Sequence, residues 1–327
     1  MKYSFFGTCS NDYEQFFGCL QTIIEQTKKP KELILVNSGK KDIEKKILNK
    51  LINSDIKLIY IMKKLNRVKS LNIAIDFSSS EYSFRYDTRS RFSKNYAENA
   101  LKILSDKSSL VGVVGGVPNV IPETNNFEAT ICSQILKRPY IFFYPKHKNI
   151  KYSGYASSIY LGCFRTKTLR EIRFNEKEAL ISEDSLIIHD FLEKGFKAYL
   201  SSSIKLSYVS RSSFKNILKL FNTYGFCRAN TIIVSRKIFI SARHFFIFIC
   251  LILFLILSSK FSFFLVLLLP LILLGINILG EIISYGRKAK FALPFYATLC
   301  QFLWILGILW GFISIFRNIK KQSNFIS

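Results

Sequence analysis

The sequence predicts an α/β domain with a mostly parallel sheet, followed by hydrophobic helices toward the C-terminus. Short apolar runs alternate with amphipathic helical patterns over roughly the first two hundred residues. From about Phe245 onward the sequence is close to continuously apolar. A chain of 327 residues has room for one large domain and a membrane segment.

The alternation of strands and helices begins at the first residues. Strands are predicted from the apolar runs at residues 5–6, 32–36, 56–60, 82–86 and 110–114. Helices between them are predicted from apolar residues at helical spacing in residues 16–24, 43–51 and 71–75. Residues 122–151 have weak periodicity and receive no assignment.

Three polar loops follow predicted strands. They are Asn11-Asp12, Asn37-Ser38-Gly39 and the loop that begins at Asp87. Because parallel strands end at one edge of a sheet, we expect the three loops to lie together there. Ligands of such sheets bind at that edge.

The charge of the chain is strongly positive. It has 47 Lys and Arg against 22 Asp and Glu, a formal net charge of +25, and after Glu193 the only acidic residue is Glu281. A basic surface can bind nucleic acid or anionic lipid. Because the basic residues here flank apolar spans, we expect anionic membrane lipids as partners and no nucleic acid.

The first residues and the cysteines indicate that the head lies in the cytoplasm. The apolar start becomes polar by Ser10, too early for the core of a signal peptide. The seven cysteines are scattered and form no Cys-x-x-Cys pair, which is typical of a reducing compartment. We therefore expect residues 1–205 to form a cytoplasmic head.

A basic amphipathic segment, residues 206–237, follows this head. From Lys205 to Arg243 the chain carries eight basic residues and no acidic one. Phe214 and Phe221 fall on one face of a predicted helix, with lysines on another. This pattern predicts a helix in the membrane interface. An ordinary amphipathic helix packed on the sheet is the alternative.

Residues 238–327 are predicted to form a membrane domain with two or three hydrophobic helices. The apolar spans cover residues 239–257, 261–278 and 291–316. With a cytoplasmic head, a third crossing would place the final basic residues outside, against the positive-inside rule. Whether the third segment spans is left open. We expect a multi-pass protein of the inner (cytoplasmic) membrane.

Glu183 and Asp184 form an adjacent carboxylate pair at a predicted helix start. The helix covers residues 183–193, follows Ser182 and ends at Gly195. Acidic residues in a first turn complement the helix dipole, so a purely structural role is one interpretation. The alternative is that one carboxylate takes a proton from an acceptor hydroxyl.

Asp87 ends a predicted strand in the sequence Asp87-Thr88-Arg89. A carboxylate there can bind a divalent cation that neutralises a leaving diphosphate, or it can simply form a turn. No P-loop, Gly-x-Gly-x-x-Gly or Gly-x-Ser-x-Gly motif occurs, which argues against kinases, Rossmann dehydrogenases and α/β-hydrolases.

Taken in order, these segments resemble the family 2 inverting glycosyltransferases, in particular the succinoglycan-type members of bacterial exopolysaccharide pathways. The resemblance covers roughly residues 3–235. Its motifs are individually weak, but their order and spacing are specific. They are Asn11-Asp12, the segments 35–39, 67–75, 84–87 and 160–165, the pair Glu183-Asp184, and the segments 210–213 and 224–228.

The resemblance implies a glycosyltransferase A-type fold that binds a nucleotide-diphosphate sugar, and it assigns roles to single residues. Asp12 and Asn37 would hold the nucleoside, and Arg67 the phosphates of the donor. Asp87 would bind Mg²⁺ or Mn²⁺. Asp184 would be the general base, with Glu183 beside it. A last pair, Tyr224 and Arg228, would close over the diphosphate.

The sequence departs from the family pattern at two of these positions. Asn37 stands where the family usually has Asp, which removes a charge but keeps a hydrogen-bond acceptor. Asp87-Thr88-Arg89 lacks a second carboxylate, and Arg89 could partly replace a cation. No Gln-x-x-Arg-Trp motif is present, which argues against a processive synthase.

The activity that the resemblance implies is inverting transfer of one sugar to a lipid-linked saccharide at the cytoplasmic membrane face, in polysaccharide biosynthesis. Transfer to a polyprenyl phosphate itself is the second enzymatic interpretation. An inactive head that serves as a membrane scaffold is the alternative from another class of protein, and the departures at Asn37 and after Asp87 favour it.

Overall fold

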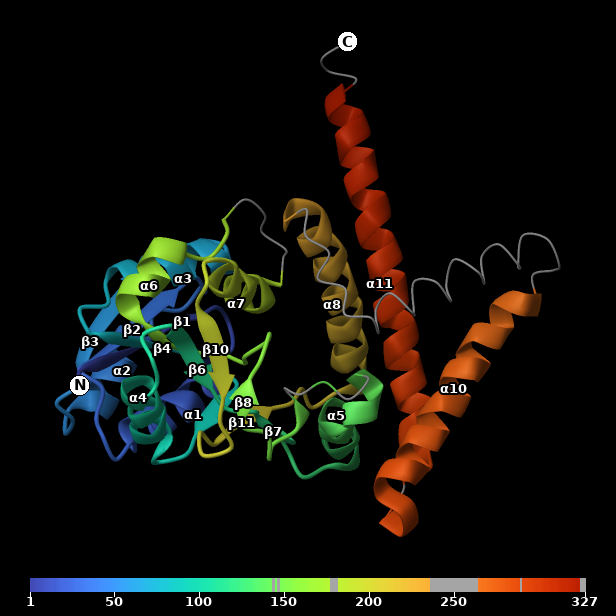
Figure 1. The fold of residues 1–327 in the computed structure, drawn as a ribbon, viewed down its shortest axis with the longest axis horizontal. Helices are drawn as coiled ribbons and strands as arrows, with labels where there is room; N and C mark the ends of the chain where they lie inside the picture. Colours follow the sequence, from blue (N-terminus) through green and yellow to red (C-terminus); the bar gives the residue numbers. More distant parts are fainter. Residues whose placement is uncertain (143–144, 146–147, 177–181, 236–263, 289, 324–327) are drawn as a thin grey trace. The chain divides into compact units, whose positions relative to one another are not determined.

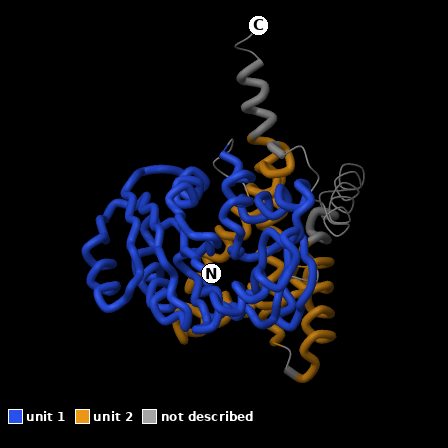
Figure 2. Tube along the Cα trace, turned by 60° about the vertical axis from the view of Figure 1, so that its left-hand side comes forward, with its two compact units in different colours: residues 1–121, 146–179, 183–210 blue, residues 122–145, 180–182, 211–327 orange. Residues whose placement is uncertain are grey.

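A computed structural model describes residues 1–142, 145, 148–176, 182–235, 264–288 and 290–323. The chain divides into two compact units, shown in different colours in Figure 2. Unit 1 comprises residues 1–121, 146–179 and 183–210. Unit 2 comprises residues 122–145, 180–182 and 211–327. The predicted division at residues 205 and 237 stays a prediction.

Unit 1 is built on an eight-stranded sheet (Figure 1). Its strand order is β3-β2-β1-β4-β9-β6-β10-β8. The strands are β1 (Tyr3–Cys9), β2 (Glu32–Asn37), β3 (Lys57–Met62), β4 (Tyr82–Tyr86), β6 (Val111–Gly115), β8 (Gly154–Tyr155), β9 (Cys163–Arg165) and β10 (Lys197–Leu200). β8 and β9 pair antiparallel with their neighbours and all other pairs are parallel, so the mostly parallel sheet is confirmed.

The register of the central strands places their carboxyl ends together. Cys9 of β1 pairs with Asn37 of β2, and Gly7 of β1 pairs with Tyr86 of β4. The loops after these three strands therefore begin at one edge of the sheet, as the sequence predicted. β1, β2 and β4 are buried along their whole length, which explains their nearly continuous apolar runs.

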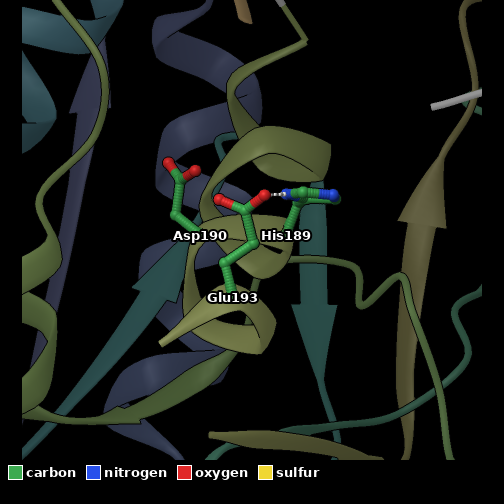
Figure 3. A group of neighbouring side chains, drawn as sticks. All are labelled: His189, Asp190 and Glu193. Carbon is green, nitrogen blue, oxygen red and sulfur yellow. Dashed lines mark ion pairs between the residues drawn. The ribbon is translucent and has the colours of Figure 1, made fainter. Parts of the chain in front are cut away.

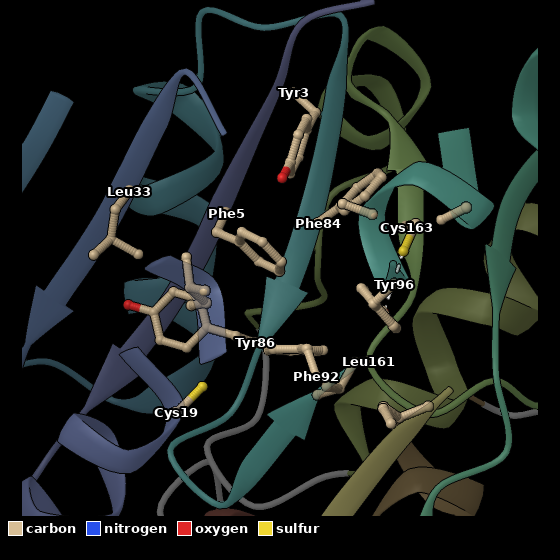
Figure 4. Packing of buried hydrophobic residues seen from close by; sticks show 14 of the residues in the cluster. Tyr3, Phe5, Cys19, Leu33, Phe84, Tyr86, Phe92, Tyr96, Leu161 and Cys163 are labelled. Carbon is tan, nitrogen blue, oxygen red and sulfur yellow. Dashed lines mark hydrogen bonds between the residues drawn. The ribbon is translucent and has the colours of Figure 1, made fainter. Parts of the chain in front are cut away.

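Helices cover both faces of this sheet. The core on one face joins the sheet to α1 (Tyr13–Ile24), α2 (Glu44–Leu51) and α4 (Tyr96–Asp106). Figure 4 shows its aromatic centre, where Phe5, Phe84, Phe92 and Tyr96 pack edge to face or tilted. The core on the other face joins the sheet to α3 (Arg67–Asp76), α6 (Thr166–Ile172) and α7 (Glu183–Glu193).

A second, three-stranded sheet in unit 1 follows the order β5-β11-β7. Its strands are β5 (Ser90–Phe92), β7 (Asn119–Ile121) and β11 (Leu206–Val209). These short strands and the helix α4 had no counterpart in the prediction. α4 nevertheless has a helical pattern, because Tyr96, Ala100 and Leu104 recur every four residues and are all buried.

Unit 2 is helical. Its elements are α5 (Phe127–Lys137), η1 (Pro139–Phe142), α8 (Phe214–Ser235), α10 (Phe264–Tyr285), η3 (Gly286–Lys288) and α11 (Ala292–Ser323). α5 and η1 lie in the region that received no assignment. Arg138, which precedes η1, forms a buried ion pair with Glu281 of α10. Two of its guanidinium nitrogens each lie 2.9 Å from a carboxylate oxygen of Glu281.

α8 packs closely against α11 within unit 2. A Cβ atom on Gly307 would lie 2.1 Å from the carbonyl oxygen of Asn222, and one on Gly225 would lie 2.0 Å from that of Trp304. Glycine is therefore required for these backbones to approach. Ile217 and Phe221 are buried, with the Phe221 ring 5.9 Å from that of Phe142, while Lys215 and Lys219 are exposed. A helix is thus confirmed in this segment, with α11 as a packing partner, and its place in the membrane interface stays a prediction.

One segment of the described chain, Ala292–Ser314, is long and apolar enough to cross a bilayer, with 23 residues and a mean hydropathy of 1.7. It corresponds to the third predicted span. The second predicted span falls on α10, whose apolar part Pro270–Tyr285 is shorter. The first, residues 239–257, lies outside the described residues. The multi-pass arrangement stays a prediction.

Candidate active site at the carboxyl edge of the sheet

Hydrogen bonds join the loops after β1 and β2 at the carboxyl edge of the sheet. The backbone N–H of Ser38 donates to the carbonyl of Cys9 at 2.8 Å, and that of Lys41 donates to the Tyr13 hydroxyl at 2.8 Å. A Cβ atom at Gly39 would lie 1.6 Å from the carbonyl oxygen of Ser10. Only glycine fits here, so the loop after β2 has a fixed place beside the loop after β1.

Asn37 is fully buried and shapes its own loop. Its Nδ2 donates to the carbonyl of Lys41 and to the Tyr60 hydroxyl, both at 2.8 Å, and its Oδ1 accepts from the N–H of Gly39 at 3.0 Å. An aspartate could not donate the first of these bonds, so asparagine suits this loop. Contact between Asn37 and a nucleoside stays a prediction.

Asp12 lies half exposed at the start of α1. Its Oδ2 is 3.5 Å from Nε of Arg89, and Nη1 of Arg89 donates to the carbonyl of Ser210 at 3.1 Å. Arg89 therefore joins the loops after β1, β4 and β11 within unit 1. Asp12 remains accessible to a ligand, and its nucleoside-binding role stays a prediction.

Two arginines and two carboxylates form an ion-pair network at the end of β4. Arg67 contributes Nη2, which lies 2.5 Å from Oδ1 of Asp87, and Nε, which lies 2.7 Å from Oε1 of Glu183. Nη2 of Arg85 lies 2.8 Å from the same Oε1 of Glu183 and 3.8 Å from Oδ1 of Asp87. The network joins the first residues of α3 and α7 to the end of β4.

Arg85 is the member of this network that sequence reasoning missed. Its side chain is only 2% exposed, and its Nε and Nη1 atoms have no hydrogen-bond partner in the described chain. Its Cζ atom lies 5.4 Å from the centre of the Phe174 ring. An arginine between Phe84 and Tyr86 of a predicted buried strand was a usable signal, because such a residue is rarely buried without a charge partner.

Glu183 forms ion pairs with two arginines, and these lower the pKa of its carboxyl group. Burial raises the pKa of Glu183, but the charges and hydrogen bonds of Arg67 and Arg85 outweigh burial and lower that pKa to about 2. So acidic a group is a weak acceptor for a proton. The Oδ1 atom of Asp184 accepts from the N–H of Ser185 at 2.8 Å, and its role as general base stays a prediction.

The two carboxylates of the network are also possible ligands for a divalent cation. Carboxylate oxygens such as those of Asp87 and Glu183 are the ligands that Mg²⁺ and Mn²⁺ prefer. In the structure one oxygen of each already binds Arg67. The chemistry of the oxygens therefore fits a hard cation, and cation binding by Asp87 stays a prediction.

The last two predicted site residues belong to unit 2. Tyr224 and Arg228 lie on α8, one helical turn apart. Tyr224 is exposed, with its ring 6.3 Å from that of Phe221, and Arg228 is half-buried. Their closure over a diphosphate stays a prediction.

A second titratable cluster lies on α7, where His189, Asp190 and Glu193 come close (Figure 3). Their possible ligand atoms lie within 4.8 Å of one another, and Nδ1 of His189 is 3.6 Å from Oε1 of Glu193. All three belong to one turn of the helix. We interpret the cluster as a surface pair between residues four apart, as expected for a mid-helix histidine.

Comparisons with known proteins give a family match, a similar sequence and a solved structure with a similar fold. Residues 9–167 match the model of the Glycosyl transferase family 2. A Methanococcus voltae protein named dolichyl N-acetyl-alpha-D-glucosaminyl phosphate 3-beta-D-2,3-diacetamido-2,3-dideoxy-beta-D-glucuronosyltransferase is 28% identical over 236 residues, which are 66% of this chain and 69% of that protein.

A solved structure extends the likeness along most of the chain. It is the mannosyltransferase PcManGT from Pyrobaculum calidifontis in complex with GDP-Man and Mn²⁺. The TM-score is 0.59 at 14% sequence identity, and the match covers 94% of this chain and 87% of that one. At this identity the likeness concerns the fold.

Proposed function

We propose that this chain, a glycosyltransferase whose residues 9–167 match the model of the Glycosyl transferase family 2, moves one sugar, with inversion, from a nucleotide-diphosphate donor to a lipid-linked saccharide. The observation that carries the proposal is the contact of Glu183 with Arg67 and Arg85. It fixes the start of α7, and with it Asp184, beside the end of β4.

The two adjacent carboxylates have different roles. Glu183 is held as an anion by two guanidinium groups and fixes the helix start. Asp184 takes the proton from the acceptor hydroxyl as that oxygen attacks the anomeric carbon. The bond from the anomeric carbon to the phosphate oxygen breaks, and the nucleoside diphosphate leaves with the electron pair. A single displacement of this kind inverts the configuration of the sugar.

The donor would lie across the carboxyl edge of the sheet. Asp12 and Asn37 would border the nucleoside, and Arg67 would bind the diphosphate. Asp87 would hold Mg²⁺ or Mn²⁺ together with the phosphate oxygens, where the cation offsets the charge of the leaving group. On α8, Tyr224 and Arg228 would close over the diphosphate.

The relative from Methanococcus voltae supports a lipid-linked saccharide as the acceptor. Its name describes transfer to a dolichyl N-acetylglucosaminyl phosphate, a lipid that already carries a sugar. Transfer to a bare polyprenyl phosphate is the second candidate. A place in exopolysaccharide assembly of the succinoglycan type is part of the proposal and rests on the motif order alone.

Attachment to the inner membrane, with the head in the cytoplasm, brings the enzyme to such an acceptor. The exposed apolar residues of unit 2 support this, among them Ile283, Phe291 and Trp310. Exposed Lys215 and Lys219 on α8 supply charges for anionic headgroups, each worth about 1 kcal/mol near the surface.

The test uses the detergent-solubilised full chain with a panel of nucleotide sugars. Two acceptors are offered: a polyprenyl phosphate that carries one sugar and a bare polyprenyl phosphate. Mass spectrometry of the extracted lipid should find one added sugar on the first acceptor only. Addition of a sugar to bare polyprenyl phosphate alone would favour the second candidate. The absence of both sugar transfer and donor hydrolysis, with every nucleotide sugar tried, would favour the inactive scaffold. In the same assay Asp184→Asn should lower the transfer rate, and Asp190→Asn, on the same helix, is the matched control.

A further inference from the structure

Arg67 lies between two carboxylates and contacts an oxygen of Asp87, the residue that would hold a divalent cation. Its guanidinium reaches Asp87 with one nitrogen, at 2.5 Å, and Glu183 with another, at 2.7 Å. Divalent cations bind carboxylate oxygens at about 2.0–2.6 Å. The guanidinium and a cation would therefore compete for Oδ1 of Asp87, because two positive charges held on one oxygen repel each other.

The two arginines of the network differ in their freedom to leave. Arg85 is 2% exposed and packs by the Phe174 ring, so its charge is a fixed part of the site. Arg67 is 45% exposed and can swing into solvent or toward a ligand. With both arginines in place the four formal charges sum to zero. Without Arg67 the remaining three sum to one negative charge, which attracts a cation.

Arg67 also lies at an unfavourable place for a cation. It is the first residue of α3, whose start is capped by the Asn66 side chain accepting from the N–H of Lys69 at 2.8 Å. A helix start carries a partial positive charge, so it repels a guanidinium and attracts phosphate. An arginine also binds phosphate with two parallel hydrogen bonds. A diphosphate arriving here can thus draw Arg67 away from the carboxylates.

We propose that Arg67 is a resident counter-cation that keeps divalent cations off Asp87 until a nucleoside diphosphate binds. The proposal rests on the donor class of the proposed function. Its consequence is that the free enzyme does not take up the cation by itself. The cation and the nucleoside diphosphate are accepted together, when Arg67 moves from the carboxylates to the phosphates.

The test measures binding of Mn²⁺ alone, without nucleotide, to the detergent-solubilised full chain. Electron paramagnetic resonance reports the free ion. The wild type should bind Mn²⁺ weakly, and Arg67→Met should bind one ion per chain about ten- to a hundredfold more tightly, the range for one charged hydrogen-bonded contact. Adding Asp87→Asn to Arg67→Met should abolish the gained site. Lys69→Met removes an exposed cation from the same turn and should behave as the wild type.

The proposal is overturned if the wild type binds Mn²⁺ alone as tightly as Arg67→Met does. Arg67→Gln replaces Arg67→Met if circular dichroism shows that the latter is unfolded, and tight binding by the wild type contradicts the proposal without any variant. The result is separate from sugar transfer. An enzyme that transfers sugar yet binds Mn²⁺ alone contradicts only the role of Arg67, whereas absent transfer contradicts only the proposed function.

Discussion

Arg85 and Glu183 lie 98 positions apart in the sequence, and their side chains meet at 2.8 Å. Arg85 comes from the middle of the sheet and Glu183 from the first turn of α7. Because Arg85 is buried, this contact fixes where α7 begins. The place of the adjacent Asp184 therefore depends on an arginine two residues before the predicted metal ligand, Asp87.

The first prediction concerns Asp184. Asp184→Asn should leave folding and donor binding intact and lower turnover by roughly 10²–10⁴, the range for a lost general base. Turnover and thermal melting of the full chain are measured in parallel. Near-normal turnover would contradict the general-base role and leave Asp184 with a structural role in the first turn of α7.

The second prediction concerns the stability of the network. Glu183→Ala should lower the free energy of unfolding by about 3–5 kcal/mol, because it leaves the buried charge of Arg85 without its closest partner. The matched control is the exposed pair of Arg173 and Asp76, 2.6 Å apart. Asp76→Ala should cost less than about 1 kcal/mol. Equal losses in the two variants, measured by denaturant unfolding, would refute the buried role of Arg85.

The third prediction concerns pH. The folded-state pKa of Glu183 is lowered to about 2, from an ordinary value of about 4.3. A lowered pKa means that the contribution of Glu183 to stability is complete above about pH 4.3 and is lost as the pH falls toward 2. The stability difference between wild type and Glu183→Gln should therefore be constant near pH 7 and shrink in acid. A difference that stays constant down to pH 3 would rule out this linkage.

The fourth prediction concerns the packing of α8 on α11. Gly307→Ala should destabilise unit 2 by about 1–3 kcal/mol, because the new Cβ meets the backbone of Asn222. Gly275→Ala on α10 is the control, since nothing lies within 4 Å of its added Cβ. Melting curves of the two variants in the same detergent give the comparison. If both melt as the wild type does, the close approach of the two helices is wrong.

The central sheet and the edge of the site could be predicted from the sequence because their signals are local. A strand buried on both faces, such as β2, is a continuous apolar run, and the polar residue at its end marks the loop. The start of α7 at Glu183 was also predicted, since serine, the residue type at position 182, is common at helix N-caps.

The network itself could not be predicted, because it depends on which distant residues the fold brings together. Nothing near Arg85 in the sequence indicates that Glu183 is its partner. The same holds for the pair of Arg138 and Glu281, 143 positions apart. α5 was missed for another reason: its buried positions include Cys132 and Ser133, which weaken the apolar pattern.

The most direct test of the account is the anomeric configuration of the product. The wild-type enzyme is given an α-linked nucleotide sugar and a lipid-linked saccharide, and the new linkage is read from the proton coupling constants in the nuclear magnetic resonance spectrum. The account predicts a β-linked product that Asp184→Asn forms at a rate lower by roughly 10²–10⁴. An α-linked product would contradict the single displacement and the role of Asp184 with it.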